Sequence, residues 1–194
     1  VRVFMASRLD WCDGSRHGIS KRNDLFIRAW ARRVLEGWDS HFIIVEHGED
    51  VEATRSLVAD LGVEDRIEFV GRLSQRDLQR HVEAADLVAD QFDQGTLGVL
   101  ALQVLATGRA LTIFVDPASN DCYGTPPPVL NGDNEEDLYN GLLSCTTRQE
   151  LAELGRLGHA WMTREYGWQR LERLMRNVIE AAASRSSIPV PGGA

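Results

Sequence analysis

Residues 87–115 read LVADQFDQGTLGVLALQVLATGRALTIFV. A short apolar run at 87–89 precedes a turn with two glycines, an apolar helical segment at 97–106 and a second apolar run at 110–115. Strands without alternating polar residues are typical of parallel sheets that helices cover on both faces. The stretch therefore predicts a strand–helix–strand unit of an α/β protein.

The same alternation extends along the rest of the chain. Further apolar runs predict strands at residues 1–5, 42–45, 67–70 and 129–130. Helical periodicity predicts helices at residues 24–36, 51–61, 74–85, 134–143 and 147–164, and from residue 168 onwards. Strands and helices that alternate with short connections predict a Rossmann-like, doubly wound parallel sheet, here followed by C-terminal helices.

The length predicts a single folded unit. We expect one domain over residues 1–183 and a flexible tail over 184–194, which is rich in Ser, Pro and Gly. Three tryptophans at helical spacings, Trp30, Trp161 and Trp168, are expected in the core.

The composition limits the classes of partner. With 43% hydrophobic and 26% charged residues, the chain resembles an ordinary globular protein. The formal net charge of −8 argues against a surface for nucleic acid or for an anionic membrane. Three cysteines at long spacings indicate reduced thiols and a cytoplasmic setting rather than disulfides or a zinc site.

The first loop is a candidate phosphate site. Ligands of open parallel sheets bind outside the carboxyl ends of the strands, and loop 6–23 follows the first predicted strand. This loop leads into a helix, with Asn23 or Asp24 as the expected N-cap, and a helix N-terminus suits phosphate. Arg8 and Lys21, the single lysine beside twenty arginines, can add two positive charges. The alternative is a solvated surface loop.

The loop at 90–98 is a second candidate. Gly95 and Gly98 allow the backbone to approach a ligand closely. Gln103 interrupts an apolar helix, where an amide must find hydrogen-bond partners. The alternative is a buried glutamine that bonds the backbone.

Several motifs then occur in a familiar order. They are SRL at 7–9, KRNDLFIRA at 21–29, VEDRIEFVGRL at 63–73, AADLV at 84–88, and Gly98 followed by QVLATGRAL at 103–111. In order and spacing, residues 2–182 resemble the C-terminal, donor-binding domain of family 4 glycosyltransferases of the GT-B fold.

The resemblance implies a function. Such a domain binds a UDP- or GDP-linked sugar, which the enzyme transfers with retention and without a metal or other cofactor, here to a polysaccharide or glycolipid acceptor. Arg8 and Lys21 match the residues that bind the diphosphate and stabilise it as the leaving group. Gly71, Arg72 and Leu73 match the loop near the nucleobase.

The resemblance also assigns the turn that faces the sugar and the phosphates. Gly95, Thr96, Leu97 and Gly98 match that turn, and Gln103 matches the residue that holds the ribose. The family commonly has a Glu-x7-Glu pair at the positions of Gly95 and Gln103. The alternative function is therefore a non-catalytic Rossmann-like binding or interaction module that has lost this pair.

Two further expectations follow from the resemblance. A sugar-nucleotide epimerase is a third interpretation, but these loops show no obvious acid/base pair. A complete transferase also has an N-terminal acceptor-binding domain, which we expect before Val1 and through which any peripheral membrane contact is made. The fragment alone is expected to be inactive, with part of the apolar stripe from Trp168 onwards exposed toward that domain.

Overall fold

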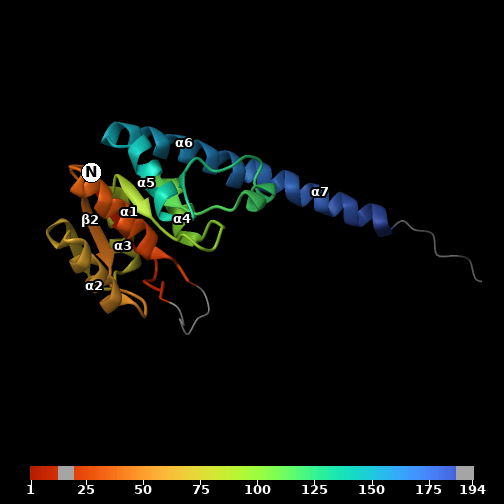
Figure 1. The fold of residues 1–194 in the computed structure, drawn as a ribbon. Helices are drawn as coiled ribbons and strands as arrows, with labels where there is room; N and C mark the ends of the chain where they lie inside the picture. The colour runs from red at the N-terminus through yellow and green to blue at the C-terminus, as the bar shows by residue number, and fades with distance from the viewer. Residues whose placement is uncertain (13–19, 187–194) are drawn as a thin grey trace, which may run out of the picture.

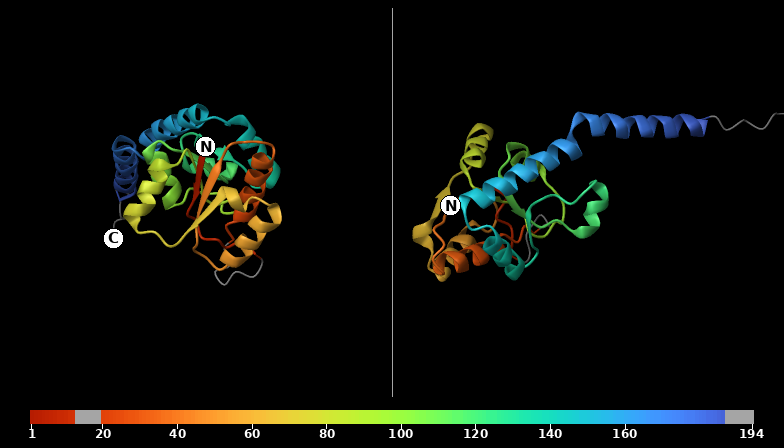
Figure 2. Two further views of the ribbon diagram at one scale, coloured as in Figure 1. Left: turned by 90° about the vertical axis from the view of Figure 1, so that its left-hand side faces the viewer. Right: turned by 90° about the horizontal axis from the view of Figure 1, so that it is seen from above.

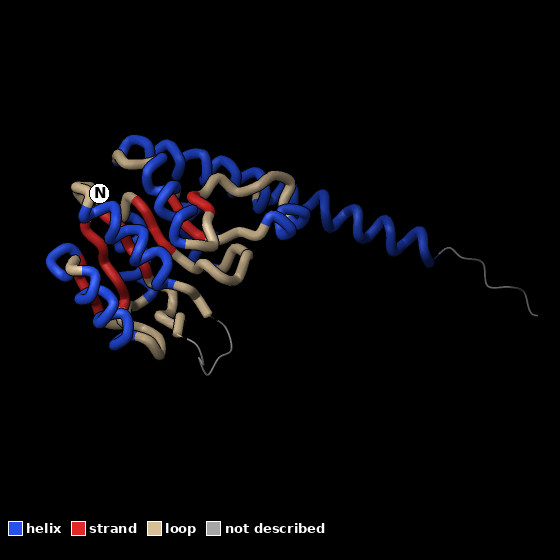
Figure 3. Tube along the Cα trace, in the orientation of Figure 1, coloured by secondary structure: helices blue, strands red, loops and turns tan. Residues whose placement is uncertain are grey.

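A computed structural model describes residues 1–12 and 20–186. Its centre is a six-stranded sheet in the order β3-β2-β1-β4-β5-β6, and every neighbouring pair is parallel (Figures 1 and 3). The strands are β1 (Arg2–Met5), β2 (His41–Val45), β3 (Ile67–Val70), β4 (Leu87–Ala89), β5 (Ala110–Ile113) and β6 (Leu130–Asn131). The expected doubly wound α/β fold with C-terminal helices is confirmed.

Seven α-helices accompany the sheet in the described part of the chain. They are α1 (Asn23–Leu35), α2 (Val51–Leu61), α3 (Gln75–Ala84), α4 (Val99–Thr107), α5 (Glu135–Ser144), α6 (Arg148–Tyr166) and α7 (Trp168–Ser186). Helix α1 packs against α2 and α5, while α4 packs against α3 and α6. These two groups cover opposite faces of the sheet, which is why its strands carry no polar alternation.

The central strands divide their side chains between the two faces. Val3 and Met5 of β1 belong to the hydrophobic cluster beneath α1, whereas Phe4 belongs to the cluster beneath α3 and α4. This alternation follows from the two-residue period of a strand. Both faces are fully buried, so the parallel register of β1 with β2 and β4 is fixed along its length.

Helix α7 leaves the body of the domain, as Figure 2 shows in its right-hand view. Trp30 and Trp161 are core residues as expected, but Trp168 is 70% exposed, so its expected core position is wrong. An exposed apolar stripe continues along the helix; it comprises Leu171, Leu174, Met175, Val178 and Ile179. Residues 184–186 belong to α7, and residues 187–194 lie outside the described residues. Among the described helices, none combines the length and apolar character needed to cross a membrane.

Candidate functional site

A pocket lies where the strand order reverses. The chain places β2 and β3 on one side of β1 and then returns to place β4 on the other, so β1 and β4 flank the reversal point. Residues after the carboxyl ends of these two strands line a pocket there, which we call the cationic pocket. Its lining residues are Ala6, Ser7, Arg8, Lys21, Leu78, Asp90, Gln91, Gly98, Val99 and Leu100. This is the position at which open α/β sheets bind ligands.

Arg8 reaches the cationic pocket from the loop after β1. Its Nε atom lies 3.2 Å from Oδ2 of Asp10, a fully buried carboxylate. The other oxygen of Asp10 accepts a hydrogen bond of 2.9 Å from the backbone N–H of Glu49. Contacts from the loops after β1 and β2 therefore fix the position of Arg8, and its side chain keeps about a third of its surface exposed.

Lys21 enters the same pocket just before α1. Its backbone N–H donates to the carbonyl of Asp10 at 2.6 Å, and its carbonyl accepts from Phe92 at 2.9 Å. The ammonium group donates to Oε1 of Gln91. Burial lowers the pKa of Lys21, the charge of Asp90 opposes this effect, and the charge of Arg8 adds to it. Two cations thus share one pocket, which favours an anionic ligand.

Asp90 is a pocket residue to which the sequence assigned no role. It follows β4 directly, and burial raises the pKa of its carboxyl group to about 6, against the opposing charge of Lys21. Its backbone carbonyl accepts a hydrogen bond of 2.5 Å from the hydroxyl of Ser7. The signal was its position at the carboxyl end of an apolar strand, where a charged side chain needs a partner.

Asn23 hydrogen-bonds Ser7, a residue that lines the cationic pocket. The expected N-cap at Asn23 or Asp24 is wrong, because Arg22 holds that position with a left-handed φ of 48° and both residues lie inside α1. The buried Asn23 amide instead donates to the hydroxyl of Ser7 at 3.0 Å. Asn23, Ser7 and the carbonyl of Asp90 therefore form one chain of hydrogen bonds across the sheet edge.

The turn before α4 has two different glycines. Gly98 is the N-cap of α4 and lines the cationic pocket. Gly95 has a φ of 66°, and an added Cβ would lie 2.8 Å from Cβ of Asp116, so it is a packed turn residue. Thr96 accepts a hydrogen bond of 3.0 Å from the Gln91 amide through its carbonyl, and Leu97 packs on the core. Of this predicted turn, only Gly98 lines the pocket.

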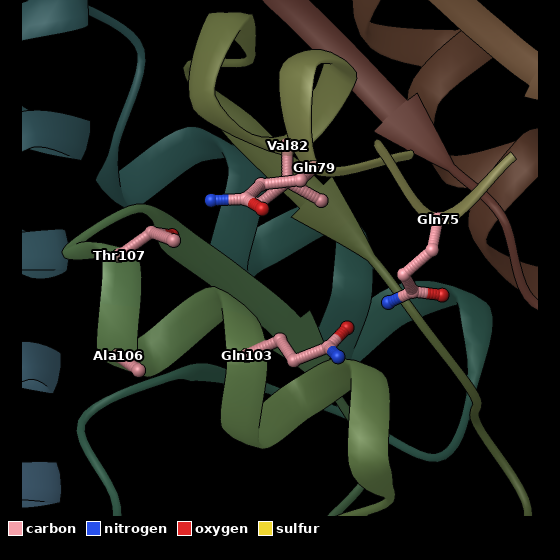
Figure 4. A pocket seen from close by; sticks show the side chains of 6 residues that line it. All are labelled: Gln75, Gln79, Val82, Gln103, Ala106 and Thr107. Carbon is pink, nitrogen blue, oxygen red and sulfur yellow. The ribbon is translucent and has the colours of Figure 1, made fainter. Parts of the chain in front are cut away.

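A second pocket lies between α3 and α4, and Figure 4 shows its side chains. We call it the glutamine pocket; its lining residues are Gln75, Gln79, Val82, Gln103, Ala106 and Thr107. Gln103 is exposed on α4, so the alternative of a buried glutamine is wrong. Gln103 lies one helical turn from Leu100, and Gln75 lies one turn from Leu78, so the two pockets adjoin along the same pair of helices.

Neither pocket alone has the volume of a typical small-molecule site. The cationic pocket has a volume of about 240 Å³ and the glutamine pocket about 230 Å³. Each is smaller than the roughly 300–1,000 Å³ of small-molecule sites, and the two combined fall within that range.

The loop after β3 lies outside both pockets. Gly71 and Arg72 are exposed, and Leu73 packs partly on the core. Burial lowers the pKa of His47, and the charges of Arg72 and then Arg8 lower it further. Arg72 therefore adds positive charge near the loop after β2. His17, in the loop after β1, lies outside the described residues.

No protein-family model matches the chain. The GDP-mannose-dependent monoacylated alpha-(1-6)-phosphatidylinositol monomannoside mannosyltransferase of Corynebacterium glutamicum is 25% identical over 173 residues, which are 83% of this chain and 44% of the enzyme. The chain thus spans less than half of that relative.

Solved structures share the fold. HepE from Anabaena, crystallised with UDP-glucose, matches with a TM-score of 0.67 and 18% identity over 93% of this chain and 48% of its own. The C-terminal domain of the glycosyltransferase LpcC from Francisella tularensis matches with a TM-score of 0.62 and 16% identity, over 86% of this chain and 85% of that domain.

Strand order and structural similarity define a Rossmann-like domain with the fold of the C-terminal half of GT-B glycosyltransferases. Within that class, the resemblance to the C-terminal domain of family 4 glycosyltransferases, expected from the sequence motifs, is confirmed.

Proposed function

We propose that this domain binds the nucleotide-sugar donor of a retaining glycosyltransferase. The observation that carries the proposal is that Arg8, Lys21 and the N-terminus of α4 at Gly98 line one pocket at the reversal point of the sheet. In this proposal, the cationic pocket holds the diphosphate. The adjoining glutamine pocket holds the ribose, with Gln103 as the contact to its hydroxyl groups.

The chemistry follows from charge. When the bond between the sugar and the diphosphate breaks, the departing diphosphate gains negative charge. Arg8, Lys21 and the N–H groups of the first turn of α4 stabilise that charge. Gly71, Arg72 and Leu73 lie farther along the same sheet edge, and we assign them to the nucleobase side of the donor.

The donor, acceptor and cellular setting are also part of the proposal. By its name, the relative from C. glutamicum uses GDP-mannose and a phosphatidylinositol mannoside, and HepE was crystallised with UDP-glucose. A UDP- or GDP-sugar and a polysaccharide or glycolipid acceptor are consistent with both. We propose that residues 1–183 act in the cytoplasm as the donor domain and that a separate N-terminal domain binds the acceptor.

A non-catalytic binding module is the second candidate function. It is favoured by Gly95, whose backbone and packing against Asp116 leave no room for a glutamate at that position. Such a module would keep the fold while its pockets bind no nucleotide sugar.

Calorimetric titration with UDP-glucose and with GDP-mannose tests the proposal. We expect saturable binding of at least one of them, and a loss of about 10–100-fold in affinity in both Arg8→Ala and Lys21→Ala, since each removes a charged hydrogen-bond donor. Arg156→Ala on the surface of α6 is the matched control and should bind as the wild type does. No binding of either ligand at millimolar concentration, or binding that both pocket variants retain, would overturn the proposal.

A further inference from the structure

A carboxylate already occupies the cationic pocket. Asp90 lines it and is only 6% exposed. The backbone N–H of Ala101 in the first turn of α4 hydrogen-bonds the Asp90 carboxyl group. If Gly98 carried a Cβ, that atom would lie 3.8 Å from Oδ2 of Asp90, which places the carboxylate beside the N-cap of the helix. Asp90 is thus the internal anion of this helix terminus.

The other charges around this carboxylate come from two loops, those after β1 and β4. Lys21, at the end of the loop after β1, lowers the pKa of Asp90 by its charge, and the charges of Arg8 and Asp10 in the same loop act on Lys21. Asp93, in the loop after β4, also acts on Lys21. Among these groups, Lys21 is the cation that stabilises the ionised form of Asp90 in the empty pocket.

A diphosphate in this pocket would need the same partners. It would draw the ammonium of Lys21 toward itself and use the N–H groups of the first turn of α4. Two anions would then share one helix terminus and one lysine. Like charges within a few ångströms disfavour each other's ionised form, so the weaker acid takes up a proton.

We propose that Asp90 is the internal anion of the donor pocket: it binds the N-terminus of α4 in the free domain and takes up one proton when a nucleotide sugar binds. The proton comes from solvent and adds to a carboxylate oxygen of Asp90. No other bond forms or breaks. This inference rests on the proposed function, because it requires the diphosphate to occupy the cationic pocket.

The direction of the pH dependence follows from two effects. In the empty pocket, burial raises the pKa of Asp90 to about 6. A bound diphosphate raises the pKa of Asp90 further, by its own charge and by drawing Lys21 away. The bound state therefore holds more protons than the free state. Affinity is highest when Asp90 is neutral, and it declines as the pH rises through about 6 toward the higher pKa of the bound state.

Calorimetry with UDP-glucose or GDP-mannose between about pH 5 and 8 measures this effect, because their diphosphate has no titrating group in that range. Each unit by which binding raises the pKa of Asp90 corresponds to tenfold in affinity across the transition. We expect about tenfold or more, together with uptake of up to one proton, measured from titrations in two buffers of different ionisation heat.

Three variants identify the group that takes up the proton. Asp90→Asn should bind without this pH dependence and without proton uptake, and about tenfold more tightly than the wild type at pH 8. Asp60→Asn, the same change on the exposed surface of α2, should keep both effects. His47→Asn should also keep them, which separates Asp90 from the histidine that lies near Arg8.

The outcomes separate the inference from the proposed function. Donor binding with equal affinity across the range and no proton uptake overturns the inference and leaves the proposed function intact. Proton uptake that persists in Asp90→Asn does the same. No saturable binding at any pH overturns the proposed function. If Asp90→Asn does not fold, the number of protons taken up by the wild type and by His47→Asn still tests the inference. No uptake in the wild type, or uptake that is lost in His47→Asn, overturns it.

Discussion

The ammonium group of Lys21 donates a hydrogen bond to the side-chain oxygen of Gln91, which lies 70 residues later in the chain. The amide nitrogen of Gln91 in turn donates to the carbonyl of Thr96 at 3.0 Å. Lys21 is therefore positioned by a neutral group that is itself fixed by the turn before α4. A neutral partner orients the ammonium without neutralising its charge, which stays available to an anionic ligand.

Gln91→Glu should weaken donor binding by about tenfold or more, because the new carboxylate pairs with Lys21 and repels the diphosphate. Gln94→Glu is the matched control. It adds the same charge in the same loop, where the Gln94 amide donates to the carbonyl of Ser20 rather than contacting Lys21. Titration with UDP-glucose or GDP-mannose compares the two variants. Equal affinities would contradict the role of Gln91.

Gly98→Ala should fold normally and bind the donor about tenfold more weakly. An added Cβ would lie 3.8 Å from Asp90 and from Gln91, an ordinary contact distance, so the unfolding temperature should not change. The same methyl group projects into the cationic pocket, where the start of α4 must approach the phosphates closely. Calorimetry and thermal unfolding of the same sample test both parts. Unchanged affinity would remove Gly98 from the site.

Gln103→Glu should tighten donor binding by about three- to tenfold, because a carboxylate accepts hydrogen bonds from ribose hydroxyls more strongly than an amide does. Gln79→Glu places the same charge in the same pocket from α3 and should not tighten binding. The comparison separates a specific contact from a change in local charge. An equal response of the two variants would argue against Gln103 as the ribose contact.

Gly155→Ala should destabilise the fold by about 1–3 kcal/mol. A Cβ at this position of α6 would lie 2.2 Å from the carbonyl oxygen of Gly108, a backbone atom that cannot yield without moving the helix. Gly141→Ala in α5 is the control, because its Cβ would meet Leu130 at 3.5 Å. That variant should gain about 0.5–1 kcal/mol from helix propensity. Denaturant unfolding measures both, and a stable Gly155→Ala would contradict the close approach.

The fold could be predicted from the sequence because its signals are local. Uninterrupted apolar runs mark buried strands, and the expected bounds agree with the structure to within a few residues. Trp168 was misplaced because its apolar stripe has no partner within the described residues. The sequence does not place Gln103, because α4 is apolar on almost all sides and its pattern does not indicate which side faces solvent. In the structure even Val99 of this helix is 75% exposed.

The site could be predicted only in part. The rule for carboxyl ends of strands selects Arg8 and Lys21 without any knowledge of side-chain contacts, and the structure places both in one pocket. Asp90 and Asn23 were not recognised as parts of that pocket. Their partners, Lys21 and Ser7, are distant in the sequence, and local patterns carry no information on such pairs.

The conformation of Gly95 constrains how this domain can change over evolution. Its φ of 66° and its contact with Asp116 make any side chain there costly, so a single codon change cannot restore the acidic residue that related transferases commonly carry. Restoring an acidic residue at position 95 would need compensating changes at Asp116 or in the turn itself. In the proposed donor site, the sugar is therefore contacted by other side chains, and new specificities are expected to arise by mutation outside this turn.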